Sequence, residues 1–463
     1  MEGQTLRKGS TLGASAALEI AVPFVRMLLL SRALPLGELG FASALATAYA
    51  LYDQVTDMAV HRYVYAERRE DLDAALAGAH GLLVLRGLLL AAGALALAPL
   101  AATLFGLPGG AGDFAALAGP LAIRGFEHLA PRVAERDYRF GPQLRAGLAG
   151  AVLSLLALIA TLALGGGHDA LTASLCGLAL GQTVASHLVA RAPYRLTLAG
   201  PAFRKALRFG APLMANGLGL AVAAQGDRVL VGALLGPETL GLYAVAMLAV
   251  LVPVSLAQRL MGAVTAAALY NAGERRAGPI RLIARAAPAL GALYACGALG
   301  CANAGIALAF GARFVPTPEV LALLSGAAML RIARAEPFTS LQLLEQRTRL
   351  VALGNLATLL ALLLSAALML ARPQVESALI GRLCGEALAL AVTFKLARPL
   401  LGTAAHDSLR ALALACGLTL AACLPLGSST TACAIVCAAL AGGFFARALF
   451  GGAASPLRAG APP

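Results

Sequence analysis

Long apolar stretches recur along almost the entire chain, and they constrain its fold more than any other feature. A transmembrane helix needs about 20 mostly apolar residues, because a backbone can cross a bilayer only with its hydrogen bonds satisfied internally. The sequence therefore predicts an all-α, polytopic membrane protein with about fourteen transmembrane helices. The predicted spans are residues 11–31, 39–60, 80–104, 113–131, 145–165, 170–190, 208–232, 240–262, 287–310, 317–335, 351–371, 376–397, 409–427 and 431–450.

Composition agrees with burial in lipid. Hydrophobic residues make up 59% of the chain and charged residues 13%, which is about half the charged fraction of soluble domains. A net charge of +13 would indicate nucleic acid in a soluble protein. Here the basic residues lie in short connectors, so the expected partner is the lipid bilayer and not nucleic acid. The eight cysteines fall in apolar stretches without metal-ligand spacing, so no metal and no bound cofactor are expected.

Basic residues gather on one side of the predicted topology. With a cytoplasmic N-terminus, 27 of them lie in cytoplasmic connectors, tails or the adjoining span ends, and only Arg32, Arg313 and Arg372 lie on the opposite side. Because cytoplasmic connectors are normally the basic ones, both termini are predicted to be cytoplasmic in a bacterial inner membrane. The apolar stretch after Arg7 and Lys8 is longer than the core of a signal peptide, so it is expected to be the first span and not a cleaved leader.

The chain also contains a weak internal repeat. Residues 28–45 align with residues 229–246, and each segment joins the first two helices of a predicted six-helix block. Both blocks begin in the cytoplasm, which is typical of two-lobed transporters with a central path. The predicted domains are an N-terminal lobe at 1–198, a C-terminal lobe at 199–400, and a two-helix hairpin with a short tail at 401–463. The matching residues are Leu34, Leu39 and Gly40 in the first copy and Leu235, Leu240 and Gly241 in the second.

A short motif in the second copy carries a resemblance to a known family. An apolar helix holds Asp227 near its end, and a Leu-Gly turn at 235–236 and a Leu-Gly-x-Tyr sequence at 240–243 follow. An Arg-rich connector at 191–208 precedes this segment. On these residues the chain resembles the polysaccharide flippases of the multidrug/oligosaccharidyl-lipid/polysaccharide exporter superfamily.

This resemblance implies a fold and a function. The implied fold is two six-helix bundles with two extra C-terminal helices. The implied function is translocation, by alternating access, of undecaprenyl-pyrophosphate-linked oligosaccharide units across the inner membrane for O-antigen or exopolysaccharide synthesis. The partners would be the lipid-linked oligosaccharide and the polysaccharide polymerase machinery, and a monomer is expected. The sequence shows no nucleotide-binding motif, so any energy is expected to come either from an H⁺ or Na⁺ gradient or from consumption of the product outside.

Ionisable residues within the predicted spans are the site candidates, because charges in a bilayer are costly and usually face a cavity or each other. Arginine suits a pyrophosphate cargo, since its guanidinium binds phosphate oxygens through a planar fork and keeps its charge. The candidate substrate-binding residues are Arg26, Arg124 and Arg259, with Asn216 and Gln225 as polar cavity residues. The candidate ion-coupling residues are Glu19, Asp53, Asp57, Glu127 and Asp227.

Structural roles stay open for the charged residues of the first and fourth spans. Glu19 and Arg26 lie seven residues apart and share a helix face, so Arg26 either binds the cargo or is balanced by Glu19. Arg124, Glu127 and His128 have helical i, i+3, i+4 spacing. They are therefore expected on one face of the fourth span, where they either pair with one another or line a cavity.

The second and third spans hold three further charges. Asp53 and Asp57 share a face of the second span and have no basic neighbour on that helix, whereas Arg86 is left without an assigned role. Lipid II flippases of the same superfamily use arginines on helices 1 and 8 and an acid on helix 2. Arg26, Arg259 and Asp53 lie on the corresponding helices, so the resemblance favours a functional role for these three.

Three other functions remain as alternatives. A multidrug exporter of the same superfamily binds cationic drugs through acids and aromatics, whereas this chain has no Trp and only 5% aromatic residues. A membrane enzyme of glycan assembly would need a polar catalytic loop, and the predicted connectors are short. A scaffold without transport activity is the third alternative. The balance of basic and acidic residues within the spans favours an anionic cargo.

Overall fold

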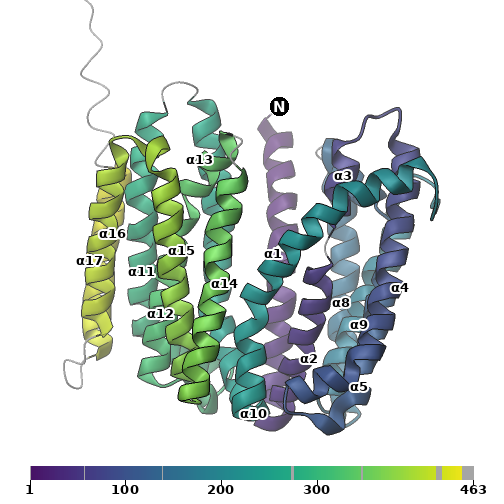
Figure 1. The fold of residues 1–463 in the computed structure, drawn as a ribbon, viewed down its shortest axis with the longest axis horizontal. Helices are drawn as coiled ribbons and strands as arrows, with labels where there is room; N and C mark the ends of the chain where they lie inside the picture. Colours follow the sequence, from purple (N-terminus) through teal and green to yellow (C-terminus); the bar gives the residue numbers. More distant parts are fainter. Residues whose placement is uncertain are drawn as a thin grey trace, which may run out of the picture. The chain divides into compact units, whose positions relative to one another are not determined.

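The computed structural model of the protein describes residues 2–56, 58–137, 139–272, 276–345, 348–423 and 430–450. Within these ranges the regular structure consists of α-helices and three short 3₁₀ segments, so the predicted all-α class is confirmed (Figure 1). The chain divides into two compact units, Met1–Ala244 and Val245–Pro463. The predicted boundary at 198/199 follows the sequence repeat and stays a prediction.

The first unit consists of long helices joined by short ones. Many of its tight helix contacts involve glycine, which lets two backbones approach closely. For example, a Cβ placed on Gly181 would lie 2.7 Å from the carbonyl oxygen of Ala149 on the neighbouring helix. The elements are α1 (Glu2–Ala33), α2 (Leu36–Val55), α3 (Val60–Ala66), α4 (Leu72–Leu104), α5 (Ala111–Ala116), α6 (Ala118–Arg124), α7 (Ala130–Val133), α8 (Gly141–Ala163), α9 (Asp169–Val189) and the first part of α10 (Pro201–Asn271), with 3₁₀ turns at Pro108–Gly110 and Ala134–Asp137.

Helix α10 (Pro201–Asn271) consists of two helices separated at Gly236: the first part precedes this glycine, and the second part follows it and enters the second unit after Ala244. Gly236 has φ 83° and ψ 174°, a conformation that residues with a Cβ rarely adopt. This turn falls between the seventh and eighth predicted spans. It also contacts the N-terminal part of α2, because a Cβ on Gly40 would lie 1.7 Å from the carbonyl oxygen of Pro237. The aligned segments of the sequence repeat therefore meet at their glycines, and a Cβ on Gly241 would lie 3.1 Å from Gly40 N.

The fourth predicted span is not one continuous helix. Residues 113–131 fall on α5, α6 and α7, and the chain leaves helical geometry after Arg124. The break occurs where Gly125 approaches α4: a Cβ on Gly87 would lie 2.7 Å from Gly125 Cα. The prediction that Arg124, Glu127 and His128 share a helix face is therefore wrong.

The Arg-rich connector after α9 lies against α4. Thr197 N donates to the carbonyl oxygen of Ala77 at 3.0 Å, and a Cβ on Gly81 would lie 1.9 Å from Thr197 O. His80 uses both ring nitrogens here: Nδ1 contacts the carbonyl oxygen of Arg195 at 2.9 Å, and Nε2 accepts from Leu129 N at 3.1 Å. These contacts hold the connector on the first unit.

The second unit is also a set of long helices. α12 begins at a well-formed cap, in which the Thr317 hydroxyl accepts from Val320 N and Pro318 occupies the first turn. The elements are the second part of α10, α11 (Ala277–Ala309), α12 (Pro318–Ala335), α13 (Phe338–Leu344), α14 (Thr348–Ala371), α15 (Val375–Leu401), α16 (Ala404–Cys423) and α17 (Thr430–Phe450), with a 3₁₀ turn at Ala312–Phe314.

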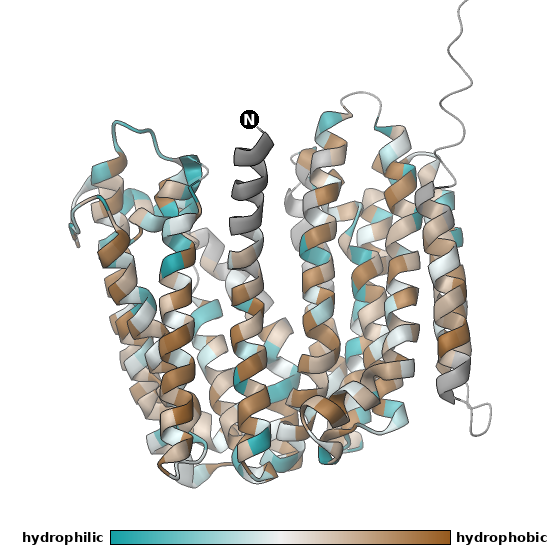
Figure 2. Ribbon diagram, turned by 180° about the vertical axis from the view of Figure 1, so that it is seen from behind, coloured by the Kyte–Doolittle hydropathy of each residue, from teal (hydrophilic) through white to brown (hydrophobic). Residues whose placement is uncertain are grey.

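Apolar surface covers the long helices. Large hydrophobic side chains on α4 are exposed, including Leu89 at 63% and Leu95 at 57%, and hydropathy colouring shows apolar residues along the helices and hydrophilic residues in the connectors near α3 (Figure 2). Such faces suit contact with lipid chains. Among the described residues, six helical segments are long and apolar enough to cross a membrane; the count of fourteen stays a prediction. The six are Gly13–Ala33, Leu72–Leu104, Gly141–Ala163, Ala224–Asn271, Ala277–Ala309 and Val375–Leu401.

Candidate functional site

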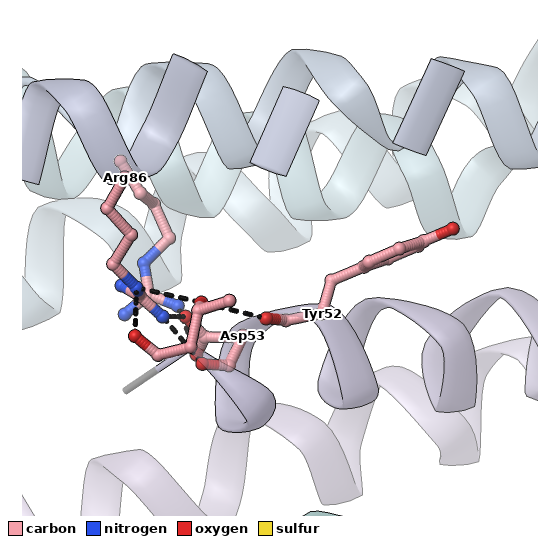
Figure 3. A network of polar contacts seen from close by, with 5 residues as sticks. Tyr52, Asp53 and Arg86 are labelled. Carbon is pink, nitrogen blue, oxygen red and sulfur yellow. Dashed lines mark hydrogen bonds and ion pairs between the residues drawn. The ribbon is translucent and has the colours of Figure 1, made fainter. Parts of the chain in front are cut away.

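One carboxylate in the first unit serves two arginines from different helices (Figure 3). Asp53, near the C-terminus of α2, accepts from Arg86 Nη2 on α4 through Oδ1 at 2.9 Å. Its Oδ2 accepts from Arg124 Nη1, in the last turn of α6, at 2.9 Å. Two cations therefore share one anion, and these three residues carry a net positive charge. The three side chains are only partly exposed, at 30% for Asp53, 16% for Arg86 and 33% for Arg124.

Arg86 also closes the C-terminal end of α2. Its Nε donates to the carbonyl oxygen and the hydroxyl of Thr56 at 2.9 and 3.0 Å, and its Nη2 donates to the carbonyl oxygen of Asp53. The last carbonyl groups of a helix lack partners within the helix, and a cation at this end also interacts favourably with the helix dipole. Arg86 is thus both a counter-ion and a C-terminal cap.

A cavity of about 200 Å³ opens beside this network. Its ionisable lining side chains include three arginines and two acids, so positive charge predominates. A cavity of this kind, walled by polar and apolar side chains from several helices, suits a small anionic group. The lining residues are Asp53, Gln54, Met58, Val60, His61, Leu83, Arg86, Arg124, Glu127, Leu129 and Arg132.

The residues after the helix break are held by separate partners. Glu127 lies 3.7 Å from Arg132 Nε and lines the cavity. His128 instead turns towards the connector, where its Nε2 lies 3.0 Å from the carbonyl oxygen of Ala192. The structure therefore places Arg124 and Glu127 in one cavity without a shared helix face, and His128 in the packing of the connector.

Arg26 is buried in the first unit with neutral partners. Its side chain is 8% exposed, and its Nη2 donates to Ser154 Oγ on α8 at 3.2 Å. Ser154 in turn contacts Ser174 Oγ at 2.8 Å. Within the described part of the chain Arg26 makes no ion pair, and its buried Nε has no hydrogen-bond acceptor. Glu19, which the sequence offers as one possible counter-ion, is exposed on α1 and does not pair with Arg26.

The motif residues of α10 form a compact polar cluster. Tyr243 Oη donates to Asp227 Oδ2 at 2.7 Å, and Arg228 Nη1 donates to Gln225 Oε1 at 2.8 Å. Asp227 is 5% exposed and Gln225 is 8% exposed. The Tyr243–Asp227 bond ties the two sides of the Gly236 turn together, whereas Arg228 and Gln225 pair on one side of it.

The remaining candidates lie elsewhere. Arg259 is exposed on the second part of α10 and belongs to the second unit. Asn216 lies on the first part of α10, where its side chain is outside the described set, and Asp57 lies outside the described residues. Within the described ranges, no group of three or more His, Cys, Asp or Glu side chains is placed to hold a metal ion.

Arg86 is the site residue that sequence reasoning missed. Its signal was present, because a lone arginine inside an apolar stretch is costly and requires a partner. The partner lies on another helix, 33 residues away, and spacing within a helix cannot show such a pair. The same limitation applies to Arg124, whose strongest partner is also Asp53.

Comparison with known proteins decides the family. The family model described as "Polysaccharide biosynthesis protein" matches residues 29–277, more than half of the chain. The chain belongs to this polysaccharide biosynthesis family. The match covers α2, α4 and the Asp53 network, and it confirms the resemblance predicted from the sequence. Together with the apolar helices, it identifies a multi-pass membrane protein of polysaccharide biosynthesis.

Solved structures share the fold of this family member. The lipid II flippase MurJ in an inward closed conformation aligns with TM-score 0.71 at 11% identity, covering 96% of this chain and 99% of that chain. The eukaryotic MATE transporter AtDTX14 aligns with TM-score 0.55 at 14% identity, covering 89% and 99%. A MOP superfamily transporter from Pyrococcus furiosus aligns with TM-score 0.50 at 16% identity, covering 86% and 95%. No curated protein matches the chain.

Proposed function

We propose that this protein is a flippase that moves undecaprenyl-pyrophosphate-linked oligosaccharides across the bacterial inner membrane by alternating access, for O-antigen or exopolysaccharide synthesis. The observation that carries the proposal is the excess of positive charge within the first unit. Arg26 lies buried beside neutral serines, and Arg86 and Arg124 share a single carboxylate. Buried arginines that outnumber their acids favour an anionic cargo, and a pyrophosphate supplies the missing charge.

The Asp53 network offers a route to ion coupling. A pyrophosphate that binds Arg124 competes with Asp53 for the same guanidinium. Asp53 Oδ2 is then free to take up H⁺ or Na⁺ while Oδ1 stays paired with Arg86, and departure of the cargo restores the Arg124 ion pair. Cargo and ion would thus exchange at one residue. Glu127 and Asp227 remain secondary candidates for coupling, and Asp57 and Glu19 are retained from the sequence.

The topology supports cargo loading from the cytoplasm. The cavity is lined by the end of α2, by α4 and by residues near the basic connector at Arg132, and this connector is predicted to be cytoplasmic. Arg26 and Arg259 would bind the pyrophosphate at other points of the path, and Asn216 and Gln225 would contact the glycan. We expect a monomer that delivers its cargo to the polymerase machinery.

Export of lipid-linked sugar by Arg26 variants tests this function. A desolvated charge-assisted contact contributes roughly 1.5–3 kcal/mol, so Arg26→Gln should slow export about tenfold or more. Arg26→Lys should restore only part of the rate, because it keeps the charge and loses the fork. Arg69→Gln is the matched control, since Arg69 forms an exposed pair with Asp137. The measurement is lipid-linked oligosaccharide retained in the cytoplasmic leaflet, and wild-type export by Arg26→Gln would contradict the proposal.

The multidrug alternative predicts a different result. MATE transporters share the fold, so the fold alone does not separate the two functions. A drug exporter should change the susceptibility of cells to cationic drugs, with no effect on surface polysaccharide. Loss of surface polysaccharide without a change in drug susceptibility would favour the flippase. An enzyme of glycan assembly would instead alter the lipid-linked sugar itself, which mass spectrometry of the accumulated lipid would detect.

A further inference from the structure

A second cavity, of about 290 Å³, lies in the second unit between α11, α16 and α17. It has two kinds of wall. One wall carries charged side chains and the other carries apolar side chains. The charged wall consists of Arg285, Asp407 and Arg410, and the apolar wall consists of Ala411, Leu414, Phe444 and Ala448.

The cavity is at one end of these three helices. α11 and α17 run antiparallel, because Gly300 contacts Ile435 while Gly442 contacts Leu293. The N-terminal part of α11 therefore lies beside the C-terminal part of α17, and the N-terminal part of α16 joins them at the cavity. All three helix ends adjoin connectors or tails that are predicted to be cytoplasmic. The cavity thus occupies the depth at which lipid headgroups lie.

Positive charge predominates at the cavity. Asp407 is shared by two arginines of α11, with Arg285 Nη2 at 2.8 Å from Oδ1 and Arg281 Nε at 3.3 Å from Oδ2. Arg410 lies one helical turn beyond Asp407 and makes no ion pair with any described residue. The lining therefore holds two guanidinium groups, Arg285 and Arg410, and one carboxylate, which Arg281 also contacts from beside the cavity. Arg281 and Arg285 are about half exposed, at 50% and 45%, so donors remain accessible to a ligand.

The apolar wall continues from the charged wall along the helices. Leu414 follows Arg410 by one turn of α16 and is 46% exposed. Phe444 and Ala448 lie one turn apart on α17 and complete this wall. A ligand that fills the cavity must therefore present an anionic group at the connectors and an apolar chain along α16 and α17.

We propose that this cavity binds the phosphate headgroup of an anionic bilayer phospholipid, held as a resident lipid at the cytoplasmic leaflet. A phosphodiester with attached acyl chains matches both walls, and basic pockets between helices on the cytoplasmic side suit anionic headgroups. A soluble phosphate would leave the apolar wall unoccupied. The site lies outside the Asp53 network and does not depend on the proposed function.

Native mass spectrometry of the full-length protein in detergent, titrated with phosphatidylglycerol or phosphatidylcholine, tests this assignment. The wild-type protein should prefer phosphatidylglycerol. Each basic residue near a membrane surface contributes about 1 kcal/mol to binding of anionic lipid, so Arg410→Gln should weaken binding about fivefold. Arg285→Gln/Arg410→Gln should weaken it roughly tenfold or more. Arg281 stays paired with Asp407 in both variants, so neither leaves the acid alone.

Arg398→Gln provides a matched control, because Arg398 is an exposed arginine of α15 outside the cavity lining. Its affinity for phosphatidylglycerol should equal that of the wild type. Unchanged binding by Arg285→Gln/Arg410→Gln would overturn the proposal. Displacement of phosphatidylglycerol by millimolar inorganic pyrophosphate would show a site for soluble phosphate, and preferential binding of undecaprenyl pyrophosphate would show a cargo site. Either result also overturns the assignment to a bilayer phospholipid.

Discussion

Asp53 is the residue on which the charges of the first unit converge. It holds Arg86 and Arg124, which come from two helices that do not follow one another in sequence. Removing a buried group leaves its partners unsatisfied, which costs more than losing both partners together. The role of the network can therefore be separated from its contribution to stability by comparing single and double variants.

Asp53→Asn should destabilise the protein by about 1–3 kcal/mol, because two guanidinium groups lose their shared anion. Asp53→Asn/Arg86→Gln should recover part of this loss, since one unpaired cation is also removed. A double-mutant cycle on thermal unfolding in detergent measures the coupling. If the network also couples cargo to ion, the double variant should remain defective in export despite its recovered stability. Additive stabilities would contradict the shared-anion geometry.

Glu336 is a buried acid that follows α12, and burial raises its pKa, against hydrogen bonds from Ser340 that lower it. The folded state then holds the carboxyl proton more tightly than the unfolded state. The contribution of this carboxyl to stability is therefore most favourable below its pKa in the unfolded chain, and it becomes unfavourable as pH rises through its pKa in the folded protein. Glu336→Gln should therefore raise the unfolding midpoint at pH 8, and this gain should shrink towards pH 4. A lower midpoint at pH 8 would show that the charged form is stabilised in the fold.

At the scale of the elements, paired glycines determine how neighbouring helices pack. Gly177 and Gly181 on α9 face α8, where a Cβ on either would approach a carbonyl oxygen to 2.6 or 2.7 Å. α15 repeats this arrangement against α14: a Cβ on Gly381 would lie 2.1 Å from Ser365 Oγ, and one on Gly385 would lie 1.9 Å from Ala361 Cβ. Both helices carry the Gly-x-x-x-Gly spacing that permits close approach of membrane helices.

Gly181→Val should separate α8 from α9, because the added side chain meets backbone atoms that cannot move independently. Overpacking of this kind costs about 1–3 kcal/mol. Gly93→Val on α4 is the matched control, since a Cβ there meets nothing within 4 Å. Thermal unfolding in detergent should show a lower midpoint than the wild type for Gly181→Val and an unchanged midpoint for Gly93→Val. Equal midpoints would contradict the tight α8–α9 contact.

Sequence patterns predict these elements unevenly, for physical reasons. Spans rich in Leu and Ala, such as 80–104 and 145–165, fall on α4 and α8, because hydropathy alone determines them. Residues 113–131 are sufficiently apolar, but their break arises from the tertiary approach of Gly125 to Gly87. Charged residues that belong to a candidate site can also be predicted from the sequence, because a charge within an apolar stretch is costly in lipid. The partners of these charges cannot be predicted in this way, because Asp53, Arg86 and Arg124 meet only after the helices have packed.

For the molecule as a whole, the two copies of the sequence repeat meet at glycines. Gly40 lies in α2, just after the turn between α1 and α2, and Gly241 follows the turn at Gly236 inside α10. Both of these turns are predicted to face the periplasm. A transporter that alternates access has to open a path on that side, and turns at the ends of helices are suitable places for such movement. This contact is therefore a suitable point to restrain the protein.

A disulfide between Gly37→Cys and Glu238→Cys should stop export in a background without the native cysteines. Both positions lie in the first unit, and a Cβ on Gly37 would lie 3.9 Å from Glu238 Cγ, the atom that a cysteine sulfur would replace, so the two cysteines would lie close enough to form a disulfide after a small adjustment. If the periplasmic turns must separate for cargo release, oxidation should abolish export of lipid-linked sugar, and reduction should restore it.

Gly300→Cys/Ala434→Cys is the control, because a Cβ on Gly300 would lie 3.7 Å from Ala434 Cβ, so this disulfide would join α11 to α17 within the second unit. That disulfide should leave export unchanged, since the two helices pack along their length. Full export with the Gly37–Glu238 bridge closed would show that cargo leaves without separation of these turns, and it would remove this movement from the mechanism.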